Sequence, residues 1–282
     1  MKFNVSAELG YQAKSTGTII LNIHALRTAR QKVLEESFTI SPQQSSEELT
    51  TITTENRFIR INITEPGDYT INYNALVDNS FEIHNYKRYT DTSVSHLDAT
   101  VLSYLNPSRY CQSDKLYRLA ENEFGNLANN YNKAVAITKW IHNHVEYLSG
   151  SSNSETSAYD TVTQQEGVCR DFAHLGIALC RALSIPARYF TGYSYMLIPQ
   201  DFHACFEAYI GGEWLLFDAT RLSPLNGFVK IATGRDAADA SIASIFGDIT
   251  GSNIKVNCQF ADEGDFKPVY HYPSVYDAVT YK

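Results

Sequence analysis

The first hundred residues contain short stretches in which apolar and polar side chains alternate. Alternation places the apolar side chains on one face of a strand, and several short strands separated by turn residues are typical of an antiparallel sandwich. The pattern therefore predicts a β-sandwich-like domain over residues 1–105, in which the polar stretch 41–55 is a loop. The expected strands lie around 3–7, 18–24, 59–63 and 69–75.

The spacing of apolar residues becomes helical after Asn106-Pro107-Ser108, a sequence that breaks regular structure. Helices are expected around 116–120, over 134–145, from about 156 to 167 and from about 170 to 183. Strands then return over 187–193, 202–210, 214–219, 227–231 and 254–260. Helices followed by an antiparallel sheet predict an α+β fold for a second domain, residues 106–282.

The composition excludes several classes of partner. The chain has 282 residues, with 23 Lys+Arg against 31 Asp+Glu and a net charge of −8. Nucleic acids and anionic membranes bind clustered Lys and Arg, so neither is an expected partner. No apolar run reaches the roughly 18 residues that cross a bilayer. The start of the chain has no continuous apolar stretch, so the sequence predicts no signal peptide and a cytoplasmic protein.

The five cysteines are an odd number at wide spacings, and no two of them form a CxxC pair. A disulfide framework and a zinc site are therefore not expected, and nothing in the sequence implies another metal or a cofactor. Most of these cysteines are expected to be small hydrophobic residues of a core. They are Cys111, Cys169, Cys180, Cys205 and Cys258.

Cys169 stands apart because it begins an apolar helix in the segment GVCRDF. The unpaired N–H groups and the positive end of a helix N-terminus stabilise a thiolate. The same N–H groups can bind the oxyanion that forms on an attacked carbonyl. Gly167 would allow a tight turn into the helix and leave space beside the sulfur. The alternative is a buried structural cysteine, which is common in protein cores.

Residues 202–220, FHACFEAYIGGEWLLFDAT, are two alternating runs joined by Gly211-Gly212, a strong hairpin signal. If these two glycines form the loop, His203 and Asp218 are diagonal neighbours on one face, about 7–8 Å apart between backbones. A loop longer or shorter by one residue would place them on opposite faces. The other face is entirely apolar and is expected in the core: Ala204, Phe206, Ala208, Ile210, Leu215 and Phe217.

A histidine oriented by a carboxylate can carry a proton, because the carboxylate fixes the tautomer and stabilises the imidazolium. The imidazolium lowers the pKa of a nearby thiol and makes it a nucleophile near neutral pH. The alternative is a surface strand on which a histidine and an aspartate occur by chance.

The order of GVCRDF and the hairpin segment resembles the transglutaminase-like superfamily, in particular bacterial members described as cysteine proteases. The resemblance implies a papain/transglutaminase-like core, with helices packed on an antiparallel sheet, after a β-rich N-terminal domain. It matches Cys169 to the nucleophile, His203 to the general base and Asp218 to the third member of a triad. The family commonly has Trp where this chain has Cys205, and Pro where it has Ala219.

The expected chemistry is acyl transfer on a peptide or protein amide through a thioester. Hydrolysis is the first choice, transamidation is the second, and an inactive binding module on the same fold is the third. The source of a second oxyanion donor stays open between Gln164, Gln165 and an upstream backbone group, and the oligomeric state cannot be read. Substrate contacts are expected at Gly167, Val168, Cys205 and Tyr193.

Overall fold

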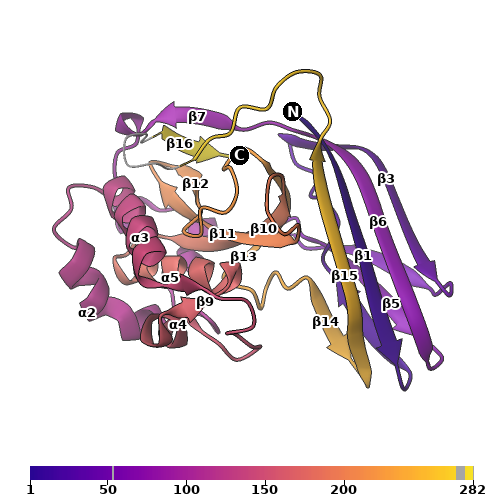
Figure 1. The fold of residues 1–282 in the computed structure, drawn as a ribbon. Helices are drawn as coiled ribbons and strands as arrows, with labels where there is room; N and C mark the ends of the chain where they lie inside the picture. The colour runs from indigo at the N-terminus through magenta and orange to yellow at the C-terminus, as the bar shows by residue number, and fades with distance from the viewer. Residues whose placement is uncertain (53, 271–276, 282) are drawn as a thin grey trace.

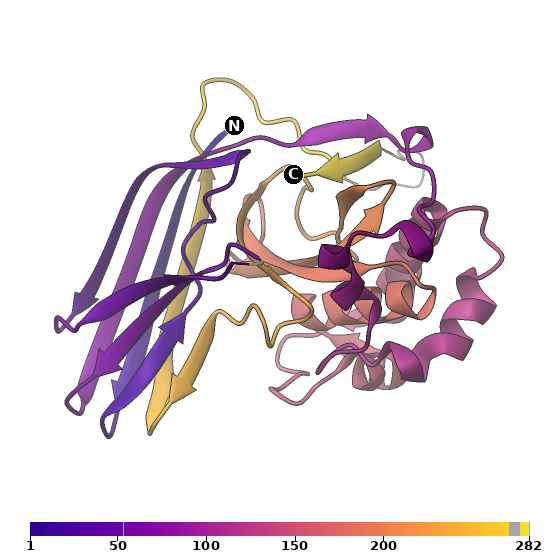
Figure 2. The same cartoon turned by 180° about the vertical axis from the view of Figure 1, so that it is seen from behind.

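The computed structural model describes residues 1–52, 54–270 and 277–281. It shows a β-sandwich beside a second part in which helices cover a smaller sheet (Figures 1 and 2). The α+β class and the order of the two parts, both predicted from the sequence, are confirmed. None of the helices in these ranges is long and apolar enough to cross a membrane.

The sandwich consists of two antiparallel sheets with four strands each. The first has the order β15-β1-β6-β3 and the second the order β14-β2-β5-β4. The inner faces carry the expected apolar side chains, which form one core cluster. The bounds are β1 (Lys2–Ala13), β2 (Gly17–Leu21), β3 (Gln31–Ser41), β4 (Ser46–Thr50), β5 (Arg57–Ile63), β6 (Gly67–Asn79), β14 (Ala243–Phe246) and β15 (Ile249–Phe260).

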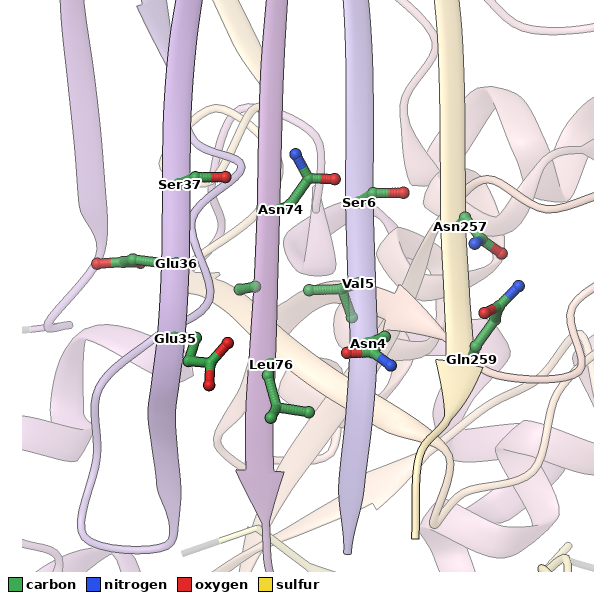
Figure 3. A pocket seen from close by; sticks show the side chains of 11 residues that line it. Asn4, Val5, Ser6, Glu35, Glu36, Ser37, Asn74, Leu76, Asn257 and Gln259 are labelled. Carbon is green, nitrogen blue, oxygen red and sulfur yellow. The ribbon is translucent and has the colours of Figure 1, made fainter.

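The outer face of the first sheet is polar. Ser6 lies between Asn74 of β6 and Asn257 of β15, and Asn4 lies between Leu76 and Gln259 on the same strands. Figure 3 shows these side chains around a shallow depression of about 500 Å³. Amide and hydroxyl groups on this face and apolar groups on the other explain the alternation that predicted the strands.

Two sequence-based assignments in this region were wrong. The stretch 41–55, expected to be a loop, contains the edge strand β4, whose side chains are almost all exposed and so lack an apolar alternation. The strand expected at 254–260 was assigned to the second domain, but β15 pairs with β1, and β14 pairs with β2. Two strands from the predicted range 106–282 therefore lie in the sheets of the predicted range 1–105.

The second part packs a largely buried helix, α5, on a sheet with the order β12-β11-β10-β13. Helix α5 contacts β11 so closely that a Cβ on Gly176 would clash with the Phe206 ring. The helices are α2 (Ser113–Phe124), α3 (Asn130–His144), α4 (Ala158–Gln164) and α5 (Cys169–Ala182). The strands are β10 (Ala187–Ser194), β11 (Phe202–Ile210), β12 (Glu213–Phe217) and β13 (Phe228–Gly234).

Shorter elements complete the described chain. Strand β8 pairs with β9 in parallel, and β7 pairs with β16 in antiparallel orientation. Their bounds are β7 (Glu82–Asn85), β8 (Glu146–Tyr147), β9 (Glu166–Gly167) and β16 (Asp277–Thr280). The short helices are η1 (Tyr86–Arg88), η2 (Val94–His96), α1 (Ala99–Leu102) and η3 (Ser103–Leu105).

Two side-chain amides of the sandwich hold it against β13. Gln31 donates to the Lys230 carbonyl at 2.8 Å and accepts from the Lys230 N–H at 2.7 Å. Asn56 does the same with Thr233, at 2.8 and 3.0 Å. Each amide makes the two backbone hydrogen bonds that a neighbouring strand would make to one residue of β13. These bonds fix the position of the sandwich beside the core sheet.

Candidate active site

Cys169 is the first residue of α5, as the sequence predicted, and it is partly exposed. The carboxylate of Asp171 accepts from the Val168 N–H at 2.9 Å and so closes the helix start. Arg170 binds the same carboxylate at 3.3 Å. Asp171 therefore orients the turn that presents the thiol, and Arg170 compensates its buried charge.

Gly167 is required by this helix start. Its backbone pairs in parallel with Tyr147 of β8, and its carbonyl accepts from the Leu148 N–H at 3.0 Å. A Cβ on Gly167 would approach the Cβ of Asp171 to 2.8 Å. The space that the sequence assigned to a substrate beside the sulfur is thus filled by the capping carboxylate.

The hairpin places a buried His–Asp pair beside the thiol. The pairing of Ile210 with Glu213 confirms that Gly211 and Gly212 form the loop, and both have positive φ. His203 Nε2 lies 3.0 Å from Asp218 Oδ2. The diagonal contact predicted from the alternation is therefore present, with Asp218 just beyond the end of β12.

Thr220 orients the carboxylate of this pair. Asp218 Oδ1 accepts from the Thr220 N–H at 2.9 Å and from its hydroxyl at 2.7 Å. The same hydroxyl lies 3.3 Å from His203 Nε2. From α3, His142 Nδ1 approaches the Ala219 carbonyl to 3.2 Å and supports the turn between Asp218 and Thr220.

The environment favours a protonated His203. Burial lowers the pKa of its imidazole, but the Asp218 carboxylate outweighs this and raises the pKa well above 6.5. A hydrogen bond with the Cys169 side chain contributes in the same direction. Since Asp218 and Thr220 engage Nε2, and Nδ1 is buried with no nitrogen or oxygen partner among the described residues, Nδ1 is the nitrogen available to the thiol.

Tyr147 is a site residue that the sequence analysis missed. Its ring packs against Phe172 of α5, with centroids 5.8 Å apart. Burial raises the pKa of its hydroxyl to about 12, and hydrogen bonds with the backbone and side chain of Cys169 also act on it. The hydroxyl therefore stays protonated near neutral pH, beside both the thiol and the N–H of Cys169. Parallel pairing of a two-residue strand gives no alternation in the sequence, so no pattern could locate it.

A cavity of about 400 Å³ contains both Cys169 and His203. One wall comes from α5 and the core sheet, and the other is the segment that leads from β13 to β14. His174 of α5 accepts from the Ala237 N–H at 3.1 Å and holds this wall to α5. The other lining residues are Tyr110, Ser154, Arg170, Tyr189, Thr191, Phe202, Ala204, Ala237, Ala240, Ser241, Ile242 and Ala243.

The four residues expected to contact substrate are absent from this lining. Gly167 and Val168 build the helix start. Tyr193 is fully buried and donates to the Ile23 carbonyl at 2.7 Å, so it joins the core to the sandwich. Cys205 is also buried, which raises the pKa of its thiol, and its sulfur lies within 4.8 Å of a ring nitrogen of His203. Cys205 therefore supports the imidazole from within the core.

His203, Cys205 and Asp218 offer a nitrogen, a sulfur and an oxygen that lie within 4.8 Å of one another. The hairpin brings these three side chains together on one face. The nitrogen and the oxygen already share the 3.0 Å hydrogen bond of the His–Asp pair. A metal ion bound here would displace the proton of that pair.

Comparison with known proteins agrees with this geometry. Residues 117–219 match the transglutaminase-like superfamily, and residues 1–100 match the N-terminal domain of bacterial transglutaminase. A crystal structure from Cytophaga hutchinsonii, described as that of a proposed cysteine protease, is 52% identical in sequence. The similarity covers 100% of this chain and 98% of that one, with a TM-score of 0.97.

Two uncharacterized mycobacterial proteins are more distant. The Mycobacterium leprae protein is 29% identical over 115 residues, 38% of this chain and 41% of the relative. The Mycobacterium tuberculosis protein is 30% identical over 114 residues, 35% of this chain and 36% of the relative. The matches thus span less than half of these curated relatives. Because the Cytophaga relative is similar along its whole length, the chain belongs to the transglutaminase-like superfamily.

Proposed function

We propose that the protein is a thiol-dependent acyl-transfer enzyme that hydrolyses peptide or protein amides, with Cys169, His203 and Asp218 as its triad. The observation that carries this proposal is the buried His203–Asp218 hydrogen bond of 3.0 Å beside a cysteine at a helix start. Such a pair holds the imidazole in one orientation and stabilises its positive charge.

The first step forms a thioester. Cys169 gives its proton to His203, and the thiolate sulfur attacks the amide carbonyl carbon, whose π electrons move to the oxygen. When the tetrahedral intermediate collapses, the C–N bond breaks, and His203 returns the proton to the departing amine. The raised pKa of His203 favours the thiolate–imidazolium form with which this step begins.

Two donors would hold the developing oxyanion. The Cys169 N–H lies in the first turn of α5, where backbone N–H groups have no partner within the helix. The Tyr147 hydroxyl, which now interacts with that N–H and with the thiol, is the second donor. A substrate carbonyl oxygen would take over the N–H and receive a hydrogen bond from the hydroxyl. Losing one such donor costs roughly 10²–10³ in kcat, so Tyr147→Phe should lose that much and keep its KM.

The second step separates hydrolysis from cross-linking. In hydrolysis, water attacks the thioester while His203 takes one of its protons, and the thiolate leaves as the acid forms. In transamidation, a primary amine attacks in place of water. Transamidation requires a site that shields the thioester from water. Cys169 is partly exposed in a cavity of about 400 Å³, which favours hydrolysis.

The decisive experiment is product identification by mass spectrometry with a peptide library, with and without an added primary amine. Shortened peptides in both conditions support hydrolysis, whereas amine-adducted peptides support transamidation. Cys169→Ala should abolish either product. Cys180→Ala is the matched control, because Cys180 lies on the same helix but is fully buried, and it should retain activity.

The third candidate, an inactive binding module, is tested by alkylation. At pH 6, iodoacetamide should modify Cys169 much faster than it modifies a free thiol peptide, because a neighbouring imidazole activates a cysteine nucleophile. An equal rate, together with no product from the library, would contradict the enzyme assignment.

A further inference from the structure

The sandwich has an opening on its inner face, at strand β15. Ile254 lies directly opposite Leu9 of β1, so both side chains point into the sandwich. Leu9 is buried, yet 52% of Ile254 is exposed. An apolar residue that faces a core and is half exposed marks a place that the second sheet does not cover.

Strand β14 forms the opposite side of this opening. Ile245 pairs with the buried Ile19 of β2 and therefore also faces inward, but it is 37% exposed. A cavity of about 560 Å³ lies at the opening and is lined by Leu9, Tyr11 and Ile254 among others. We call this opening, which lies between Ala243 of β14 and Ile254 of β15, the sandwich slot.

The slot adjoins the cavity that holds the thiol. Ile242 and Ala243 line both cavities, because the segment that forms one wall of the active site continues directly into β14. In Figure 1, β14 lies between the helix-covered part and β15. A chain that leaves the thiol cavity along this wall reaches the slot.

We propose that the slot is an extended subsite for the polypeptide substrate, which docks an apolar segment there while its reacting amide lies at Cys169. This inference rests on the proposed function and adds a substrate class: extended chains with Leu, Ile, Val or Phe on one side of the reacting bond. The sandwich is then part of the substrate site.

The backbone at the slot suits an extended occupant. Both β14 and β15 are end strands of their sheets, so one side of each has N–H and C=O groups free of ladder partners among the described strands. A peptide strand can pair with such an edge and place alternate side chains in apolar pockets. Long uncovered edges invite pairing with other chains. Neither strand contains proline.

The test uses the wild-type chain and Ile254→Glu with two peptide pools, one of twelve-residue random peptides and one of blocked tetrapeptides. Burying one large apolar side chain contributes about 1.5–3 kcal/mol, which corresponds to roughly 10- to 100-fold in affinity. Wild type should prefer the longer pool and enrich for apolar residues away from the reacting bond. Ile254→Glu should raise KM for the longer pool 10- to 100-fold and leave the tetrapeptides unchanged.

The matched control is Leu34→Glu. Leu34 lies on β3, the opposite end strand of the same sheet, and is 46% exposed. It should change neither pool. Ile245→Glu, on the other side of the slot, serves as a second variant and should reproduce Ile254→Glu. Equal length preference in wild type and both slot variants would overturn the proposal.

A binding measurement separates this proposal from the catalytic one. Photo-leucine peptides of twelve residues are cross-linked to Cys169→Ala, which cannot form a thioester, and the modified residues are mapped by mass spectrometry. Cross-links at residues 242–254 that disappear in Cys169→Ala/Ile254→Glu support the slot even if no product is ever found. Cross-links elsewhere would overturn it, as would a dimer of the chain that Ile254→Glu dissociates, since a second copy would then fill the slot.

Discussion

Two residues on one face of strand β11, His203 and Glu207, belong to buried charge pairs. The two pairs differ in whether every nitrogen and oxygen of the β11 side chain has a hydrogen-bond partner. Glu207 is held by Lys230 Nζ at 3.0 Å and by Arg188 Nε at 2.6 Å, so both of its oxygens are engaged by cations. In the pair nearer the cleft, His203 uses Nε2 for Asp218 and keeps Nδ1 without a nitrogen or oxygen partner among the described residues.

If the proposed function holds, the difference separates a structural pair, Glu207 with its two cations, from a chemical pair, His203 with Asp218. Burying a charge is costly unless the charge is paired and hydrogen-bonded, and Glu207 meets that condition completely. His203 meets it through Nε2 only, and its side chain lines the cavity that also contains Cys169. Two carboxylate–cation pairs on one strand thus have opposite expected effects on activity and on stability.

The largest expected effect is that of Asp218→Asn on activity. The amide keeps the size of the side chain but removes the charge that raises the pKa of His203. Loss of the orienting carboxylate in a triad lowers kcat by about 10⁴, which is about 5.5 kcal/mol. We expect that loss with the peptide library, together with slower alkylation of Cys169 at pH 6. Unchanged alkylation and turnover would assign Asp218 a structural role.

Glu207→Gln should have the reverse profile. It leaves Lys230 and Arg188 without a compensating charge, and breaking a buried pair costs about 3–5 kcal/mol. The free energy of unfolding, measured in urea, should fall by that amount. The alkylation rate of Cys169 in the folded variant should stay at the wild-type value. A fall in alkylation at constant stability would show that the two pairs are coupled.

The sequence predicted the chemical pair better than the structural one. Two glycines fixed the length of the hairpin loop, so alternation alone placed His203 and Asp218 on one face. The apolar helix that follows Cys169 in the sequence likewise placed this residue at a helix start. Both inferences rest on residues close together in the chain, where geometry follows directly from spacing.

The residues that the sequence could not locate are joined by distant contacts. Lys230 reaches Glu207 from β13, and β15 pairs with β1 across almost the whole chain. Tyr193 was expected at the cleft, but only the packing of the sandwich on the core decides that its hydroxyl meets Ile23. The slot could not be predicted from the sequence either, because Ile254 occupies an apolar position in an alternating strand, and such positions are normally buried.

The two pairs should also oppose each other in pH dependence. Burial, partly offset by Glu207, lowers the pKa of Lys230 to about 8. Between pH 8 and 10.5 the unfolded chain holds a proton that the native Lys230 has lost, so stability rises with pH there. For His203, whose folded pKa lies above 6.5, the stabilising contribution is complete below pH 6.5 and is lost as pH rises through the folded pKa.

Unfolding in urea at a series of pH values measures this contrast. Lys230→Met should remove the rising contribution, by at most about 1.4 kcal/mol per pH unit, and Asp218→Asn should remove the falling one. The other titratable groups contribute equally to the pH dependence of stability in each variant and in wild type, so their contributions cancel in the difference. Parallel pH curves for wild type and Lys230→Met would show that Lys230 keeps an ordinary pKa.

The smallest expected effect is that of Thr220→Val. The hydroxyl of Thr220 donates to Asp218 Oδ1 at 2.7 Å and lies 3.3 Å from His203 Nε2, so it orients the pair without taking part in the chemistry. Valine keeps the shape and removes one hydrogen bond to a charged group, a loss of about 1.5–3 kcal/mol.

Part of that loss should appear in turnover, as a fall of roughly tenfold, about 1.4 kcal/mol, because the carboxylate keeps its charge and its bond to the Thr220 N–H. The control is Thr161→Val, which removes a buried hydroxyl bonded to the Ser157 carbonyl in α4. It should lower stability by about 1 kcal/mol and leave turnover unchanged. If both variants lose only stability, the Thr220 N–H alone positions the Asp218 carboxylate. The His203–Asp218 pair then depends less on neighbouring side chains than the Glu207 pair does.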